Sequence, residues 1–76
     1  MMTKIRDPKL LVKFGRHLKA VRKNKGLSQE DLANDADIPI NQVGRIERGH
    51  VNPSLSTLNS LAKAFKISVS KLLEGI

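Results

Sequence analysis

Two side chains that could read DNA bases stand four residues apart within segment 40–48. They are the amide of Asn41 and the guanidinium of Arg45, and this spacing places both on one face of a helix. In the major groove, Asn pairs with the N6 and N7 atoms of adenine, and Arg pairs with the O6 and N7 atoms of guanine. Ile40, which could contact a thymine methyl group, and Gln42 flank the pair near the N-terminal end of the segment. The pattern predicts a short helix that enters the major groove of double-stranded DNA.

A glycine, Gly44, separates the two expected base readers. One interpretation is that its missing side chain lets the helix approach the DNA most closely, so that Gly44 belongs to the base-reading face. The other interpretation is that Gly44 allows close packing within the protein. The sequence leaves both interpretations open.

A second group of polar residues is expected to contact phosphates, which fix the position of a protein on DNA without reading its sequence. One of them begins an expected helix, whose free N–H groups also attract phosphate. The others follow the base-reading segment or belong to an expected N-terminal arm over residues 1–7. For the charged members, a solvated surface residue is the alternative. The candidates are Gln29, Arg48, Asn52, Lys4 and Arg6.

The charge of the chain also indicates a polyanionic partner. Its 76 residues include 14 Lys and Arg but 7 Asp and Glu, which gives a formal net charge of +7 and a pI near 10.3. Residues 1–27 hold nine of these cations and a single acid, Asp7. The alternative explanation is that these surface cations serve only solubility. Charge alone does not choose between the two explanations, so the choice depends on the motifs.

Five helices are expected to position these residues, in one compact domain over residues 8–76. Apolar residues at intervals of three and four mark the first helix, which begins after the N-cap Asp7 and ends before Gly26. Serines supply the N-caps of the second, fourth and fifth helices. The expected ranges are 8–25, 29–36, 40–48, a fourth helix that follows Ser54, and 69–73.

Three local features of these helices carry further expectations. Gly15 lies inside the first helix, where Gly costs about 1 kcal/mol relative to Ala, which suggests that another backbone passes close to it. Pro39 excludes helical backbone for the residue before it, so the chain must turn between the second and third helices. In the fourth helix, the stripe expected to face the core comprises Leu55, Leu58, Leu61, Ala62 and Phe65.

Three motifs along this pattern resemble the Cro and phage-repressor type helix-turn-helix family, also called the XRE family. They are GLSQEDLA at 26–33, VGRIERG at 43–49 and NPSL at 52–55. The resemblance covers about residues 14–74 and implies an all-α, five-helix, lambda-repressor-like domain whose second and third helices form the helix-turn-helix. It also implies a sequence-specific transcriptional regulator that binds a near-palindromic operator as a homodimer.

The resemblance implies roles for particular residues as well. In the family, the residues that match Arg22 and Glu47 form a partly buried ion pair, and the residue that matches Gln29 contacts a phosphate. Asp37 departs from the family pattern, because Gly is usual at this position, which tends to need a left-handed backbone. Pro39 departs from it too, since Ser or Thr is common there, so a different cap is expected for the third helix.

The C-terminal segment carries more apolar residues than one short helix can bury. Leu72 is assigned to the core, which leaves Leu73 and Ile76 for a dimer interface. A frayed chain end at Ile76 is the alternative.

Other function classes find less support in the sequence. Neither a Ser-His-Asp arrangement nor a glycine-rich phosphate loop indicates an enzyme. The two histidines, His17 and His50, are expected at the surface and lack the spacing of metal ligands, so no metal or cofactor is implied. The two aromatic residues, Phe14 and Phe65, fall on core stripes, which disfavours RNA and single-stranded DNA as partners.

The chain has no cysteine and no apolar stretch of membrane-spanning length, so we expect a cytoplasmic protein that does not enter a membrane. A protein-interaction or antitoxin module on the same fold is the alternative function.

Overall fold

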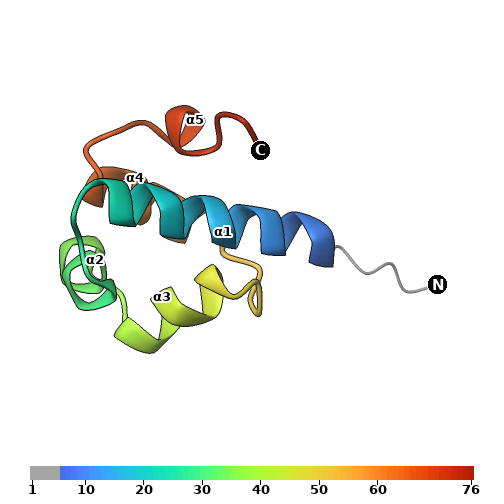
Figure 1. Cartoon of the computed structure of the whole chain (residues 1–76), viewed down its shortest axis with the longest axis horizontal. Coiled ribbons are helices and arrows are strands. Elements are labelled where there is room, and N and C mark those ends of the chain that lie inside the picture. Colours follow the sequence, from blue (N-terminus) through green and yellow to red (C-terminus); the bar gives the residue numbers. More distant parts are fainter. Residues whose placement is uncertain (1–5) are drawn as a thin grey trace.

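The computed structural model describes residues 6–76, and every regular element in this range is a helix (Figure 1). Lys4 lies outside the described residues. The expected all-α fold with five helices is confirmed. α1, α3 and α5 each end one residue earlier than the sequence suggested. The helices are α1 (Pro8–Asn24), α2 (Gln29–Ala36), α3 (Ile40–Glu47), α4 (Leu55–Ala64) and α5 (Val69–Leu72).

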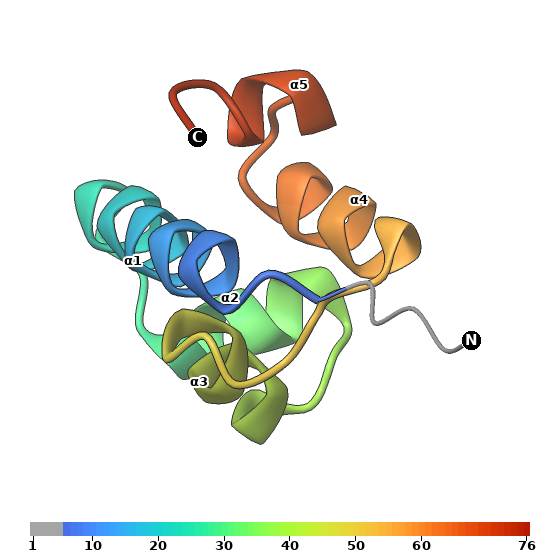
Figure 2. The ribbon, with the colours of Figure 1, turned by 90° about the vertical axis from the view of Figure 1, so that its right-hand side faces the viewer.

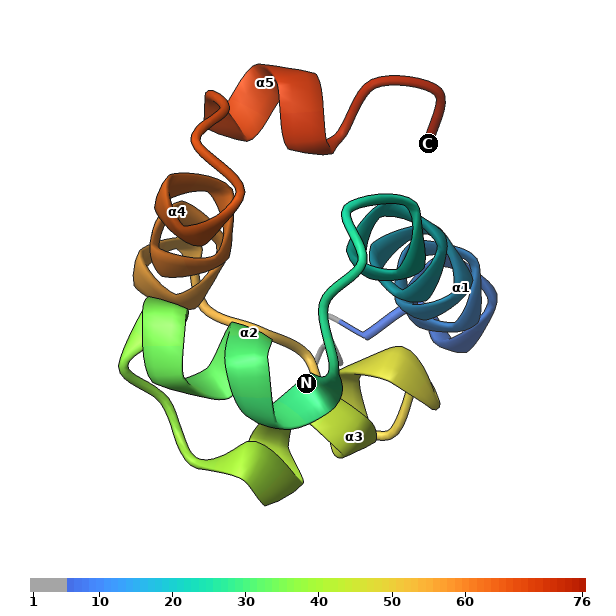
Figure 3. The same cartoon turned by 60° about the vertical axis from the view of Figure 1, so that its left-hand side comes forward.

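The helices are arranged with α3 and α5 at opposite edges of the domain. α3 forms the lower edge in Figure 1, α5 forms the upper edge, and α1 runs between them. The rotated view in Figure 2 shows α1 and α4 on either side of the centre, and Figure 3 shows α2 beside α3 and below α4. Contacts join α2 to α3 and α4, α1 to α3, and α4 to α5. No described helix is both long and apolar enough to cross a membrane.

Local hydrogen bonds explain where the helices begin. The Asp7 side chain accepts a bond of 3.1 Å from the Leu10 N–H, and Pro8 follows at a position where a missing N–H costs nothing. At α2, the Ser28 hydroxyl accepts from the Asp31 N–H, and the Asp31 carboxylate accepts from the Ser28 N–H, both at 2.9 Å. This reciprocal pair is a capping box. Serines also cap α4 and α5, as expected.

The turn between α2 and α3 uses a left-handed residue. Asp37 has φ 57° and ψ 46°, the conformation expected at this position. The Ile38 N–H donates to the Ala33 carbonyl at 3.0 Å, which closes the helix end. Pro39 is the N-cap of α3 and makes no side-chain cap hydrogen bond. The third helix therefore begins with a cap different from those of the other four.

The core lies between α1, α2, α3 and α4, with Leu72 of α5 added to it. One expected member of the α4 stripe is absent from the core: Leu55 is 74% exposed. Leu55 is the first residue of α4, and it is exposed although its spacing is that of the stripe. The buried apolar residues are Leu11, Phe14, Leu18, Leu32, Ala33, Ala36, Val43, Ile46, Leu61, Ala62, Phe65 and Leu72.

α1 lies directly against the backbone at the end of α3. A Cβ atom on Gly15 would stand 2.5 Å from the carbonyl oxygens of both Ile46 and Glu47. The close backbone approach expected at Gly15 is therefore present. The turn after α3 repeats the arrangement, since a Cβ on Gly49 would lie 2.8 Å from a methyl carbon of Val12. Two glycines thus fix the distance between α1 and the C-terminal end of α3.

The end of α4 and the position of His17 differ from expectation. Lys66 is left-handed, with φ 60°, and the Ile67 N–H donates to the Ala62 carbonyl at 3.0 Å. His17 was expected at the surface, but it is half-buried, and its Nε2 lies 2.7 Å from the Leu72 carbonyl oxygen. This hydrogen bond joins α1 to α5. The expectation for His50, which is exposed, is confirmed.

Candidate nucleic-acid interface

The outer face of α3 presents the side chains that the sequence assigned to base reading. Asn41 and Arg45 are exposed, Ile40 is 49% exposed and Gln42 is half-buried. Neither Asn41 nor Arg45 forms a side-chain hydrogen bond or ion pair within residues 6–76. The opposite face of α3 carries Val43 and Ile46, which are buried in the core. The helix therefore shows a polar face whose hydrogen-bonding groups have no partners within the described protein.

Gly44 does not share this exposure. It is buried, and the nearest atoms are side-chain atoms of Arg48 and of Gln29 in α2 rather than backbone atoms of another helix. A Cβ on Gly44 would stand 3.0 Å from Nη1 of Arg48 and 3.7 Å from Oε1 of Gln29. Of the two interpretations of Gly44, this placement favours packing within the protein.

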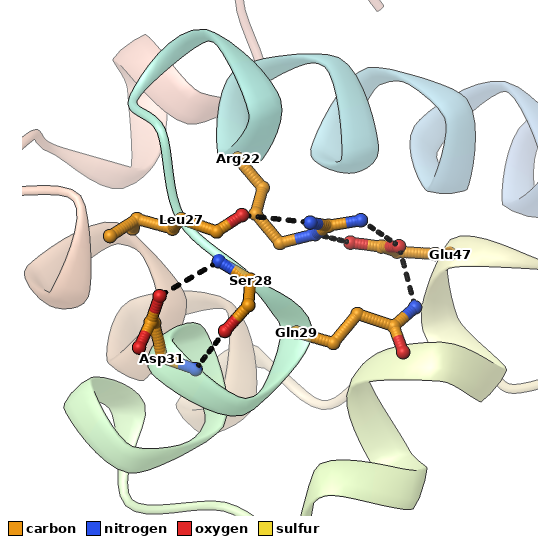
Figure 4. A network of polar contacts seen from close by, with 6 residues as sticks. All are labelled: Arg22, Leu27, Ser28, Gln29, Asp31 and Glu47. Atoms are coloured by element: carbon orange, nitrogen blue, oxygen red, sulfur yellow. Dashed lines mark hydrogen bonds and ion pairs between the residues drawn. The ribbon is translucent and has the colours of Figure 1, made fainter.

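Arg22 of α1 and Glu47 of α3 form the ion pair that the family resemblance implied (Figure 4). Nε of Arg22 donates to Oε2 of Glu47 at 2.6 Å, and Nη2 donates to Oε1 at 3.1 Å. Nη1 donates to the Leu27 carbonyl at 2.8 Å. Both side chains are more than nine-tenths buried. The hydrogen bond from Arg22 to the Glu47 carboxylate raises the pKa of the guanidinium and so favours its charged form.

Gln29 joins the same network from α2. Its Nε2 donates to Oε1 of Glu47 at 2.9 Å, so that one carboxylate receives hydrogen bonds from α1 and α2 (Figure 4). An amide nitrogen carries two N–H groups, and this bond uses one of them. The network holds the C-terminal end of α3 against the N-terminal end of α2. Sequence reasoning assigned Gln29 to phosphate and did not find its bond to Glu47.

The remaining phosphate candidates lie in and around the loop after α3. Arg48 is the exposed C-cap of α3, and Asn52 is exposed in the loop that follows. Nη2 of Arg6 donates to the His50 carbonyl at 3.3 Å, which holds this residue of the expected arm beside the same loop.

Leu73 and Ile76 line an open apolar pocket of about 400 Å³. Leu73 is 38% exposed and Leu10 of α1 is 47% exposed, whereas Ile76 packs partly against the core. Leu72, assigned to the core from the sequence, is fully buried. Sequence reasoning missed Leu10, although its spacing of four from Phe14 places both on one side of α1. Besides Leu10, Leu73 and Ile76, the pocket is lined by Leu11, Phe14, Asn52, Pro53 and Leu58.

Comparison with known proteins identifies the family. The model of a helix-turn-helix family, HTH_3, matches residues 18–72. The transcriptional regulator DdrOP3 of Deinococcus deserti is 42% identical over 65 residues, which are 86% of this chain and 50% of that protein. The immunity repressor protein of Bacillus phage phi105 is 42% identical over 59 residues, 78% of this chain and 41% of that protein. This chain thus spans half or less of the length of either relative.

A solved structure gives the same result at the level of the fold. The crystal structure of the restriction-modification controller protein C.AhdI from Aeromonas hydrophila superposes with a TM-score of 0.82 at 44% identity. The match covers 84% of this chain and 97% of that one. The chain belongs to the XRE-type helix-turn-helix family, with α2 and α3 as the helix-turn-helix. Its relatives are named as transcriptional regulators and a repressor, not as enzymes.

Proposed function

We propose that the protein is a transcriptional regulator that binds a specific sequence in double-stranded DNA, with α3 in the major groove. The observation that carries this proposal is the outer face of α3, where the exposed side chains of Asn41 and Arg45 have no partner within residues 6–76. The Asn41 amide has both donors and an acceptor, which match adenine, whereas the Arg45 guanidinium has donors only, which match the two acceptors of guanine. Ile40 and Gln42 complete the proposed base-reading surface. Gly44 belongs to the same helix and contributes indirectly, because the side chains of Arg48 and Gln29 pack over it.

The phosphate contacts are proposed for Gln29, Arg48 and Asn52, with Lys4 and Arg6 as additional cations. Gln29 and Arg48 come from the two helices of the helix-turn-helix, and Arg48 lies one turn beyond Arg45. The Arg22–Glu47 pair has a different role in this proposal: it is architectural, because it is buried and orients α3 against α1.

The proposed division between base and phosphate contacts can be tested by selecting bound sequences from a random pool of DNA duplexes. Arg45→Ala should weaken specific binding by about 1–3 kcal/mol and relax the preference at one base pair per half-site. Arg48→Ala should weaken binding to all sequences alike and lower the salt slope of the binding constant by about 1.

Arg16→Ala is the matched control, because it removes one exposed cation from α1 without touching α3. An unchanged base preference in Arg45→Ala would reject its assignment as a base reader. A wild-type protein that fails to bind any duplex at low salt would favour the protein-interaction or antitoxin alternative.

We further propose that the protein binds DNA as a homodimer through Leu73 and Ile76. Leu73 and Leu10 are the exposed apolar residues at the pocket, and a second copy would cover them. In Figure 1 the C-terminus lies at the upper edge and α3 lies at the lower edge, so the proposed interface leaves α3 uncovered. A two-fold axis would relate the α3 helices of the two copies, as two half-sites of an operator require.

Sedimentation of the wild type and of Leu73→Lys tests this interface. The charge should prevent association in the variant, while its circular dichroism spectrum stays that of the wild type. A wild type that is monomeric at high concentration, or a variant that dimerises normally, would contradict the proposal.

A further inference from the structure

The guanidinium of Arg48 lies back over α3, on top of Gly44. Arg48 follows Gly44 by four residues, which places the two on one face of the helix, and long helical side chains point toward the preceding turn. A hydrogen atom at Gly44 leaves the space that the guanidinium occupies, because a Cβ there would stand 3.0 Å from Nη1. Any other residue at position 44 would push the guanidinium outward.

The amide of Gln29 approaches the same space from α2. Its Nε2 is held by Glu47 at 2.9 Å, and this bond turns its Oε1 toward Gly44, at 3.7 Å from the position of a Cβ. The carboxylate that holds the amide is neutralised by two hydrogen bonds from Arg22. The Arg48 guanidinium and the Gln29 amide thus both border the position that a Gly44 Cβ would take, at 3.0 Å and 3.7 Å.

We propose that Gly44 is a positioning residue that keeps the Arg48 guanidinium beside Gln29, so that the two side chains bind one DNA phosphate together. The guanidinium supplies charge and N–H donors to the phosphate. Oε1 of Gln29 is an acceptor on the side of the guanidinium, and the N–H of Nε2 that Glu47 does not use is the donor that Gln29 offers to the phosphate. Gly44 acts through Arg48 and does not touch the DNA. This inference rests on the proposed function, because it names how the phosphate is held at the same interface.

The decisive substitutions are Gly44→Ala and Gly44→Leu, which leave the net charge unchanged. The nearest obstacle to an alanine Cβ is the end of a flexible side chain, so the fold is retained and Ala adds helix propensity in place of Gly. We expect the melting temperature of Gly44→Ala to equal or exceed that of the wild type. The thermal measurement thereby separates a folding defect from a binding defect.

The binding measurement is a KCl titration of affinity on a random duplex and on a selected sequence. Gly44→Leu should weaken both about tenfold, equivalent to about 1.4 kcal/mol, and lower the salt slope by about 0.9, the contribution of one phosphate contact. Gly44→Ala should show a smaller change in the same direction. In an Arg48→Ala background, neither substitution should have a further effect, since the guanidinium that each would displace is already absent.

Three outcomes distinguish failure of the inference from failure of the proposed function. If Arg48→Ala lowers the salt slope but Gly44→Leu does not, the phosphate contact stands and the role of Gly44 is rejected. If Gly44→Leu weakens binding equally in the Arg48→Ala background, position 44 faces the DNA directly and the inference is overturned. If Arg48→Ala leaves the slope unchanged, the proposed phosphate contact itself fails, and the inference fails with it.

A measurement without DNA supports or rejects the geometry independently. In the free wild-type protein, NMR should show nuclear Overhauser contacts between the Gly44 α-protons and the Arg48 side chain. Their absence in the wild type would overturn the inference, and their loss in Gly44→Leu would support it.

Discussion

Adding one methyl group at position 15 tests the closest helix contact in the fold. In Gly15→Ala the new Cβ would lie 2.5 Å from two main-chain oxygens of α3 and 2.8 Å from the Glu47 carbonyl carbon. Main-chain atoms within a helix cannot rotate away as a side chain can. α1 and α3 must therefore separate by about 0.9 Å, the difference between 2.5 Å and the 3.4 Å at which ordinary van der Waals contact begins.

The expected loss of stability follows from two opposing effects. Overpacking of a tight contact costs about 1–3 kcal/mol, and replacing Gly by Ala within a helix returns about 1 kcal/mol. The cost should exceed the gain, because the separation also stretches the Arg22–Glu47 pair, whose Nε and Oε2 atoms are 2.6 Å apart. We expect a net loss of roughly 1–2 kcal/mol, which lowers the melting temperature of a domain of this size by about 5–15 °C.

Thermal unfolding followed by circular dichroism measures this loss. Gly44→Ala is the matched control, because it makes the same substitution inside another helix where the obstacle is a flexible side chain. Gly15→Ala should lower the melting temperature, whereas Gly44→Ala should leave it unchanged or raise it. A Gly15→Ala protein as stable as the wild type would refute the backbone contact between α1 and α3.

Three further predictions concern the ion pair, the left-handed residues and the cap of α2. Glu47→Leu should lower the free energy of unfolding, measured with denaturant, by about 3 kcal/mol. This is the lower end of the range for a broken buried ion pair, because Arg22 keeps the Leu27 carbonyl as a partner. A loss below about 1 kcal/mol is the value of an exposed pair and would contradict this prediction. Asp37→Gly and Lys66→Gly should each raise the free energy of unfolding by roughly 0.4–1 kcal/mol, because both residues are left-handed, and unchanged unfolding curves would contradict this. The hydrogen bonds from Ser28 lower the pKa of Asp31, so its stabilising effect is present above the ordinary carboxyl pKa and is lost as the pH falls through the lowered value. Asp31→Asn should therefore be less stable than the wild type at pH 7, and the difference should shrink in acid; a difference that is constant with pH would argue against the capping box.

Helix starts and stops were predictable because their causes are local. Asp7 and Ser28 cap helices through hydrogen bonds to residues three positions away, and such patterns can be read from the chain. Gly26 and Gly49 mark helix ends because both adopt positive φ, which glycine permits. Lys66 adopts the same conformation without any sign in its residue type. Its φ is set by the helix-end hydrogen bond of Ile67 and by the packing of Ile67 on the core.

The sequence predicts which residues of α3 form the candidate site, but it does not predict how side chains from different helices pack around them. The spacing of Asn41 and Arg45 fixes a common face, and the structure shows both side chains exposed. The covering of Gly44 depends on how Arg48 and Gln29 meet across two helices, which no local pattern states. Leu55 shows the same limit. Its spacing predicts which face of α4 it lies on, but spacing does not predict whether another helix covers that position.

The outer face of α3 is separate from the interactions that hold the domain together. Ile40, Asn41 and Arg45 are exposed, and the last two make no side-chain hydrogen bond or ion pair to any described residue. Substitutions at such positions usually change stability by less than about 0.5 kcal/mol. A combinatorial library at these three positions would thus consist almost entirely of folded proteins. The domain is a scaffold on which new DNA targets could be selected without redesign of its core.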